Sequence, residues 1–228
     1  MLKNIFLLCF YSASLSAQTV TVDYIMGKFE PAKDKRFVKV EIKYADKADM
    51  YLRKETYEAF QKMHAAAAKD GVSLKIISAT RNFARQQAIW EGKWHNLSQI
   101  KTPKDRALKI LEFSAMPGSS RHHWGTDMDL NNLTNEYFDA GAGKKMYDWL
   151  MQHASTFGFC QPYSVGRTEG YHEEKWHRTY MPLSKPWTEF AKTHLTDAQI
   201  QGFLGSGTAT SIEIVKHYIL GISTLCLH

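Results

Sequence analysis

Residues 120–129 read Ser-Arg-His-His-Trp-Gly-Thr-Asp-Met-Asp, and this stretch constrains the fold more than any other part of the chain. His122 and Asp129 are seven positions apart, an odd separation that would place their side chains on opposite faces of one straight strand. Gly125 lies between them, and glycine most readily allows the chain to turn. We therefore expect His122 on a loop, a turn at Gly125 and a short strand over residues 126–130.

Asp127 shares this predicted strand with Asp129. Because side chains alternate along a strand, the two carboxylates face the same side, about 7 Å apart along the strand. One of them can bind a metal ion at about 2 Å. The other then supports the site from behind, and the sequence leaves open which carboxylate has which role.

A second stretch that combines histidines and carboxylates is Tyr-His-Glu-Glu-Lys-Trp-His, at residues 171–177. A hydrolytic zinc site takes three protein ligands, commonly imidazoles and a carboxylate, and keeps a fourth position for water. Two histidines and one aspartate from the two stretches satisfy this requirement. A nearby glutamate that does not bind the metal would take a proton from the water, so Zn²⁺ is the expected cofactor.

The order Ser-x-His-x-x-Gly-x-Ala-x-Asp, followed downstream by Glu-x-Trp-His, resembles the VanY-type D-alanyl-D-alanine carboxypeptidases, which are zinc peptidases that trim peptidoglycan stem peptides. The first half matches here at Ser120, His122, Gly125 and Asp129, and the second at Glu174, Trp176 and His177. The resemblance implies the site residues. The zinc ligands would be His122, Asp129 and His177, and the catalytic base would be Glu174.

An upstream Ser-x-x-Arg element of that family matches residues 78–81, with Gln86 five residues beyond Arg81. The resemblance implies that Arg81 lies near the substrate and stabilises the oxyanion or the terminal carboxylate, a role suited to a permanently charged planar donor. It also implies that Ser120 and Gln86 contact the substrate.

Two points stay open within the resemblance. The family usually has alanine where this chain has Asp127, and this carboxylate could compete as the ligand or hydrogen-bond a histidine. Glu173 lies next to Glu174, although the family spacing favours Glu174 as the base.

The fold expected from the pattern and from the resemblance is α+β, with a small central antiparallel sheet that holds the zinc and helices that flank it. Periodic apolar residues and capping residues predict helices over 55–69, 83–94, 102–113 and 144–157. Short strands are expected at 74–77 and 126–130, and extended segments at 159–163 and 171–180. Short helices are expected at 187–195 and 197–204, whereas 211–222 is ambiguous between helix and strand.

The first 17 residues combine a lysine, a short apolar run and a stretch of serine and alanine, which predicts a secretory signal peptide. A buried N-terminal strand is the alternative. The apolar run is too short to span a bilayer, so we expect export to the periplasm or cell envelope, no stable membrane insertion after cleavage, and a zinc peptidase domain over residues 18–228. That domain retains Cys160 and Cys226, either as a disulfide or as two thiols.

Composition excludes several other classes of protein. With 44% hydrophobic and 23% charged residues, the chain is neither disordered nor collagen-like nor a polytopic membrane protein. The net charge is +6, but the basic residues are scattered along the chain, so we expect no nucleic-acid partner. A mild positive charge is compatible with an anionic cell wall. The expected protein is a monomer.

The expected activity is zinc-dependent removal of the terminal D-alanine from peptidoglycan stem peptides. An endopeptidase with the same zinc site is one alternative. The other is a zinc-dependent cell-wall binding module without turnover, which would need the metal ligands but not the base Glu174.

Overall fold

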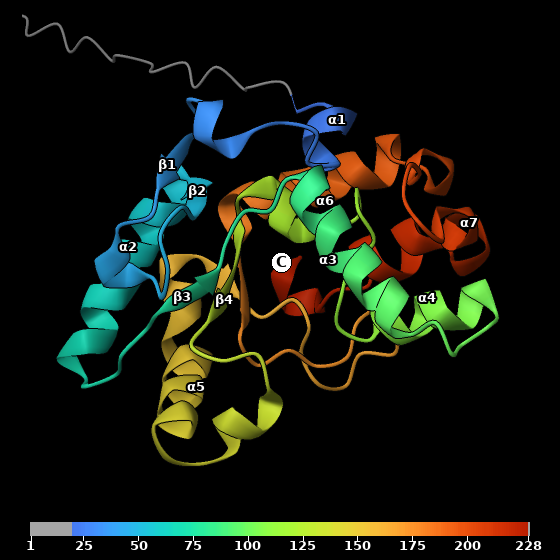
Figure 1. The fold of residues 1–228 in the computed structure, drawn as a ribbon. Coiled ribbons are helices and arrows are strands. Elements are labelled where there is room, and N and C mark those ends of the chain that lie inside the picture. The colour runs from blue at the N-terminus through green and yellow to red at the C-terminus, as the bar shows by residue number, and fades with distance from the viewer. Residues whose placement is uncertain (1–19, 228) are drawn as a thin grey trace, which may run out of the picture.

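A four-stranded antiparallel sheet in the order β3-β4-β6-β5 forms the centre of the computed structural model, which describes residues 20–227 (Figure 1). Its strands are β3 Ile76–Ser78, β4 Asp127–Leu130, β5 Phe159–Cys160 and β6 His177–Tyr180. A second sheet pairs β1 Phe37–Lys39 with β2 Tyr51–Arg53. The α+β fold with a small central sheet is thus confirmed, and the predicted signal segment 1–17 lies outside the described residues.

The pairing of β4 with β6 joins the two sequence stretches that carry histidines and carboxylates. Asp129 lies opposite His177, and Asp127 lies opposite Thr179. Because side chains alternate, the intervening Met128 points to the other face of the sheet, where it is fully buried. One face of β4 therefore carries polar groups and the other contributes to a hydrophobic core.

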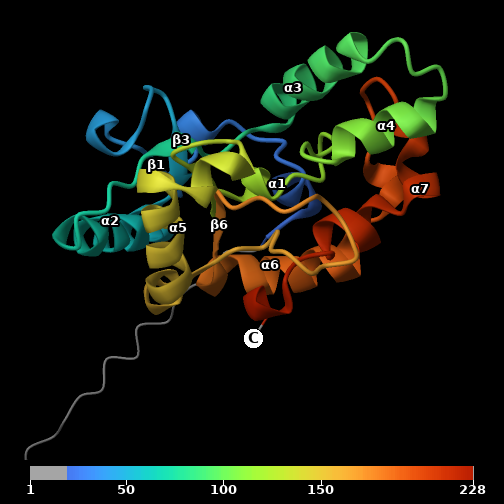
Figure 2. The ribbon, with the colours of Figure 1, turned by 90° about the horizontal axis from the view of Figure 1, so that it is seen from below.

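Helices lie on both sides of the sheet, with α2 and α5 on one side and α3, α4 and α7 on the other (Figures 1 and 2). The helices are α1 Val22–Ile25, α2 Lys54–Lys69, α3 Phe83–Asn96, α4 Pro103–Leu111, α5 Gly141–His153, α6 Met181–His194 and α7 Ala209–Ile212. One core joins α2 and α5 to the sheet, and a second joins α1, α3, α4, α6 and the C-terminal segment. Within residues 20–227, none of the helices combines the length and the apolar character needed to cross a membrane.

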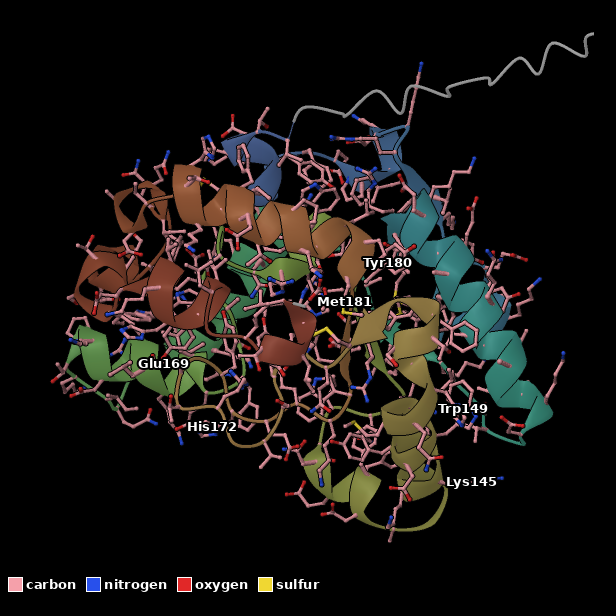
Figure 3. All side chains as sticks on the ribbon, turned by 180° about the vertical axis from the view of Figure 1, so that it is seen from behind. Lys145, Trp149, Glu169, His172, Tyr180 and Met181 are labelled. Carbon is pink, nitrogen blue, oxygen red and sulfur yellow. A yellow bond between two sulfur atoms is a disulfide. The ribbon has the colours of Figure 1, made fainter. Side chains whose placement is uncertain are left out.

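The end of α2 is held by side chains from α5. The indole nitrogen of Trp149 donates to the Asp70 carboxylate at 2.7 Å, and Lys145 Nζ donates to the Gly71 carbonyl at 3.1 Å. Figure 3 shows Lys145 and Trp149 on the same helix, on the side of the molecule where α2 lies. These contacts satisfy polar groups at the C-terminal end of α2.

The observed elements refine several expected boundaries. The helix predicted over 144–157 is α5 followed by a 3-10 helix, Ala154–Phe157, which ends at Gly158 with φ of 83°. Of the extended segment expected at 171–180, only β6 forms a strand. The ambiguous segment 211–222 is helical, with the end of α7 followed by a π-helix, Val215–Ile219.

A disulfide joins Cys160, at the end of β5, to Cys226 near the C-terminus, which answers the question that the two cysteines left open (Figure 3). Two hydrogen bonds reinforce this connection. Ser223 N donates to the Pro162 carbonyl at 2.7 Å, and Arg167 donates to the Gly221 carbonyl at 2.7 Å. The C-terminal segment thus anchors the loop that follows β5.

We predict that the double variant C160A/C226A unfolds more easily than the wild type. The disulfide links residues 66 positions apart, and a closed loop of this length restricts the unfolded chain by about 4 kcal/mol in the chain-entropy model. Guanidinium unfolding of the oxidised proteins measures the difference in the free energy of unfolding. Reductant should weaken the wild type and leave the variant unchanged; equal stability of the two oxidised proteins would contradict the prediction.

Candidate metal centre

A cavity of about 310 Å³ opens beside the polar face of the sheet. Its polar lining combines residues from both sequence stretches with Arg81 from the segment after β3. The full lining consists of Arg81, Ile89, Lys93, Phe113, Ser114, Ala115, Ser120, His122, Asp129, Leu133, Tyr163, Tyr171, Glu174, Trp176 and His177. Its volume is within the range that suits a small substrate.

Three buried residues in this cavity, His122, Asp129 and His177, bring one possible ligand atom each to within 4.8 Å of the others. His122 Nε2 lies 3.4 Å from Asp129 Oδ2, and His177 Nδ1 lies 3.4 Å from Asp129 Oδ1. Asp129 Oδ1 is buried and has no hydrogen-bond partner among residues 20–227. Two imidazoles and a carboxylate with an unpartnered buried oxygen fit a zinc ion with three protein ligands.

His122 is oriented by the backbone that follows β3. Its Nδ1 lies 2.9 Å from the Ala79 carbonyl, which can only accept, so Nδ1 carries the proton and Nε2 is free to bind a metal. Two residues further along this segment, Arg81 N donates to the His122 carbonyl at 3.1 Å. Gly125 then turns the chain into β4 with φ of 77°, as predicted, and a Cβ there would lie 2.4 Å from the Phe37 ring.

The His177 ring lies between the two aspartates of β4, which confirms that Asp127 and Asp129 face the same side. His177 Nε2 donates to Asp127 Oδ2 at 2.8 Å, and Nδ1 lies 3.0 Å from Glu174 Oε2. Burial alone would lower the pKa of His177, but the hydrogen bonds to Asp127 and Glu174 outweigh it and raise the pKa to about 9. Without a metal, the ring therefore bridges carboxylates as a cation.

Asp127 and Asp129 differ in what surrounds them. Asp127 is fully buried outside the cavity lining, and its Oδ1 accepts hydrogen bonds from the hydroxyls of Thr126 and Thr179 at 2.6 and 2.7 Å. Asp129 lines the cavity. The geometry therefore gives Asp127 a hydrogen bond to a histidine, one of the two roles left open, and presents Asp129 to a metal.

Glu174 is the glutamate that reaches the cavity. Its backbone is fixed on both sides, since its N–H donates to the Tyr163 carbonyl at 2.9 Å and its carbonyl accepts from Gln161 at 3.2 Å. Burial raises the pKa of the Glu174 carboxyl, and the hydrogen bond from His177 acts in the opposite direction. Glu173 is absent from the cavity lining and is partly exposed.

Two cationic side chains line the cavity. The Nε of Arg81 is buried and finds no hydrogen-bond partner in the part of the chain that the structure describes, while the Arg81 carbonyl accepts from His123 Nδ1 at 2.6 Å. Lys93 Nζ donates to Ser114 Oγ at 2.5 Å, and burial followed by the charge of Arg81 lowers the pKa of Lys93. An anionic group bound in the cavity would satisfy Arg81 Nε and offset the two charges.

His123 fixes the backbone of Arg81 through a hydrogen bond to the Arg81 carbonyl. Burial lowers the pKa of His123 to about 3, so this ring is neutral. It donates to the Arg81 carbonyl through Nδ1 and accepts from Gly118 N at 3.0 Å through Nε2. His123 thereby connects the Arg81 segment to the loop before Ser120.

The structure brings Ser120 to the cavity but not Gln86. Gln86 is buried on α3, and its amide donates to the Ala115 carbonyl at 2.8 Å, which supports the loop that leads to Ser120. Lys93 is a cavity residue to which sequence reasoning assigned no role. A lysine on a polar helix surface carries no signal that could have identified it.

Comparison with known proteins places this geometry in a family. The family model described as VanY, D-alanyl-D-alanine carboxypeptidase, matches residues 49–183. YodJ of Bacillus subtilis (strain 168), a protein named as a carboxypeptidase, is 30% identical over 163 residues, which cover 68% of this chain and 55% of YodJ. A D-alanyl-D-alanine carboxypeptidase of Enterococcus faecalis is 29% identical over 129 residues, or 54% of this chain and 46% of that protein. The chain spans about half the length of these curated relatives.

Two solved structures share the fold. VanYB in complex with D-alanine-D-alanine superposes with a TM-score of 0.52 and 22% identity, covering 72% of this chain and 87% of VanYB. The LD-carboxypeptidase LdcB superposes with a TM-score of 0.53 and 22% identity, covering 84% of this chain and 81% of LdcB. These two structures show the fold, and the family model that matches residues 49–183 confirms what the motif order predicted: the chain belongs to the VanY family of D-alanyl-D-alanine carboxypeptidases.

Proposed function

We propose that this protein is a zinc metallopeptidase that removes the terminal D-alanine from peptidoglycan stem peptides. One observation carries the proposal: His122, Asp129 and His177 meet within 4.8 Å in a cavity where the Glu174 carboxylate lies 3.0 Å from His177. Three ligands together with a glutamate that is not needed as a ligand are the requirements of zinc-dependent hydrolysis. A binding module would not need this glutamate.

The described residues assign roles in the reaction. Bound zinc would polarise the scissile carbonyl and lower the pKa of water from about 15.7 toward 7. Glu174 would accept the proton of the attacking water and pass it to the leaving amine of D-alanine. Burial raises the pKa of Glu174, and this suits a general base that must also return the proton.

Arg81 supports a preference for the end of a peptide. Its buried Nε has no hydrogen-bond partner within the described residues, and Lys93 adds a second positive charge to the same cavity. A free terminal carboxylate would give Arg81 a charge-assisted hydrogen bond that an internal peptide bond cannot supply. We therefore place Arg81 on the terminal carboxylate, with Ser120 beside it, and favour the carboxypeptidase over the endopeptidase.

Export to the periplasm or cell envelope is part of the proposal. Peptidoglycan lies outside the cytoplasm, and the Cys160–Cys226 disulfide is typical of oxidising compartments. The N-terminal pattern of a signal peptide agrees with both. We propose residues 18–228 as the peptidase domain, acting as a monomer without nucleic acid or membrane insertion.

We predict that zinc-loaded protein releases one D-alanine from a stem pentapeptide, as measured by mass spectrometry. Amidation of the terminal carboxylate is the control, and it should slow release because Arg81 loses its charged partner. Internal cuts in cross-linked muropeptide would instead support an endopeptidase. Absence of any product would contradict both enzymes and favour a binding module.

We predict that E174Q retains zinc but loses turnover by a factor of about 10² to 10⁴, because a general base is removed while the ligands stay. The matched control is E173Q, which changes the neighbouring glutamate outside the cavity lining and should behave as the wild type. Metal content and product formation are measured on the same samples. An active E174Q protein would show that another group acts as the base.

We predict that H122A and H177A each lose zinc after dialysis, because either change leaves two protein ligands. H172A is the control, since His172 is exposed and lies outside the cavity lining. Figure 3 shows His172 on the loop near Glu169, away from α5. Elemental analysis gives the zinc content per chain, and full occupancy in both variants would refute the ligand assignment.

A further inference from the structure

A buried polar network lies behind His177, and the proposed reaction does not use it. Asp127 accepts from His177 Nε2 at 2.8 Å and from the hydroxyls of Thr126 and Thr179. Asp127 is fully buried, so no water replaces these donors. Both oxygens of the Asp127 carboxylate therefore accept hydrogen bonds. Asp127 contacts Nε2 of His177, whereas Glu174 and Asp129 lie near Nδ1 of the same ring.

Arg121 balances the charge of Asp127. Its Nε lies 3.4 Å from Asp127 Oδ2, and its terminal nitrogens donate to the hydroxyls of Thr188 and Thr179 at 3.0 and 3.4 Å. The guanidinium carbon lies 4.3 Å from the centre of the Trp124 ring. Since Arg121 is 1% exposed, its charge and that of Asp127 form a buried pair. Either charge buried without the other would destabilise the folded protein.

The two imidazoles of the metal centre are supported by different groups. His122 donates to a neutral carbonyl, that of Ala79, at 2.9 Å, whereas His177 donates to a carboxylate. A carboxylate behind a metal-binding histidine fixes the ring orientation and raises the basicity of the ligating nitrogen. The support behind His177 therefore carries a charge, whereas the support behind His122 does not.

We infer that Asp127 is a positioning residue that holds His177 with Nε2–H turned into the protein and Nδ1 facing the cavity, and so tightens metal binding. The inference rests on the proposed zinc centre. Asp127 itself is no ligand, because its oxygens are occupied by Thr126, Thr179 and His177 and it does not line the cavity. Among the hydrogen bonds of the described residues, Asp127 is joined to His177 and not to His122, so the positioning role concerns one of the two histidine ligands.

The test measures the zinc dissociation constant of the full chain by competition with a chromophoric chelator. D127A should bind zinc about 10- to 100-fold more weakly than the wild type. D127N keeps the size and shape of the side chain, and its amide oxygen can still accept from His177 Nε2, so this variant should lose less zinc affinity than D127A. It is the control for a loss of folding in D127A. Unchanged affinity in D127A would overturn the role of Asp127.

A double variant distinguishes the loss of His177 positioning from the effect of leaving the buried Arg121 charge unpaired. D127A leaves Arg121 buried without its partner, whereas D127A/R121M removes both charges. If Asp127 acts through His177, the double variant stays as weak as D127A. Recovery of wild-type affinity would trace the loss to the unpaired Arg121 and would overturn the inference.

Nitrogen-15 NMR of histidine rings supplies a readout that does not depend on activity. In the zinc-loaded wild type, His177 should show a protonated Nε2 that exchanges slowly with water, and in D127A this proton should exchange faster while His122 is unchanged. Zinc bound through His177 Nε2 would contradict the inference. A wild type that binds no zinc would refute the proposed metal centre and the role of Asp127 with it. A wild type that binds zinc with the same affinity as D127A would refute the role of Asp127 alone.

Discussion

The register between β4 and β6 is the constraint on which the site depends. It places Asp129 opposite His177, and it is fixed at both ends by backbone hydrogen bonds, from Tyr180 N to the Thr126 carbonyl at 2.9 Å and from Leu130 N to the Trp176 carbonyl at 3.1 Å. A slip by one residue would turn every side chain of β6 to the opposite face. The His177 imidazole would then point into the hydrophobic core beneath α2 and α5, and the metal centre could not form.

The parts of the chain outside the family match also serve the site. Residues 184–227 pack against α3 and α4, and the disulfide attaches their end to Cys160, the last residue of β5, where the loop to Glu174 begins. That loop carries Tyr163, whose carbonyl accepts from Glu174 N at 2.9 Å. The proposed catalytic base is thus held by a loop with a covalent anchor, while the ligands are held by the sheet and by the turn at Gly125.

How much could be predicted from the sequence depends on whether the signal was local. Strand alternation placed Asp127 and Asp129 on one side, and the need for a positive φ identified the turn at Gly125. Gln86 matches a motif by spacing, yet its amide is bound to the Ala115 carbonyl and it does not line the cavity. The pairing of Cys160 with Cys226 and the role of Asp127 depend on which distant residues surround them, and residue spacing does not contain that information.

The charge of Asp127 raises the question of how a metal centre tolerates an extra carboxylate close to a ligand. A bound cation is commonly the largest local charge in its site, and an added negative charge nearby would change the balance that sets its acidity. Here Arg121, 3.4 Å from Asp127, cancels that charge within the same buried cluster. The pair therefore has no net charge, and what it adds is a hydrogen bond to His177. Geometry at the ligand can change in this way while the electrostatic environment of the metal is preserved.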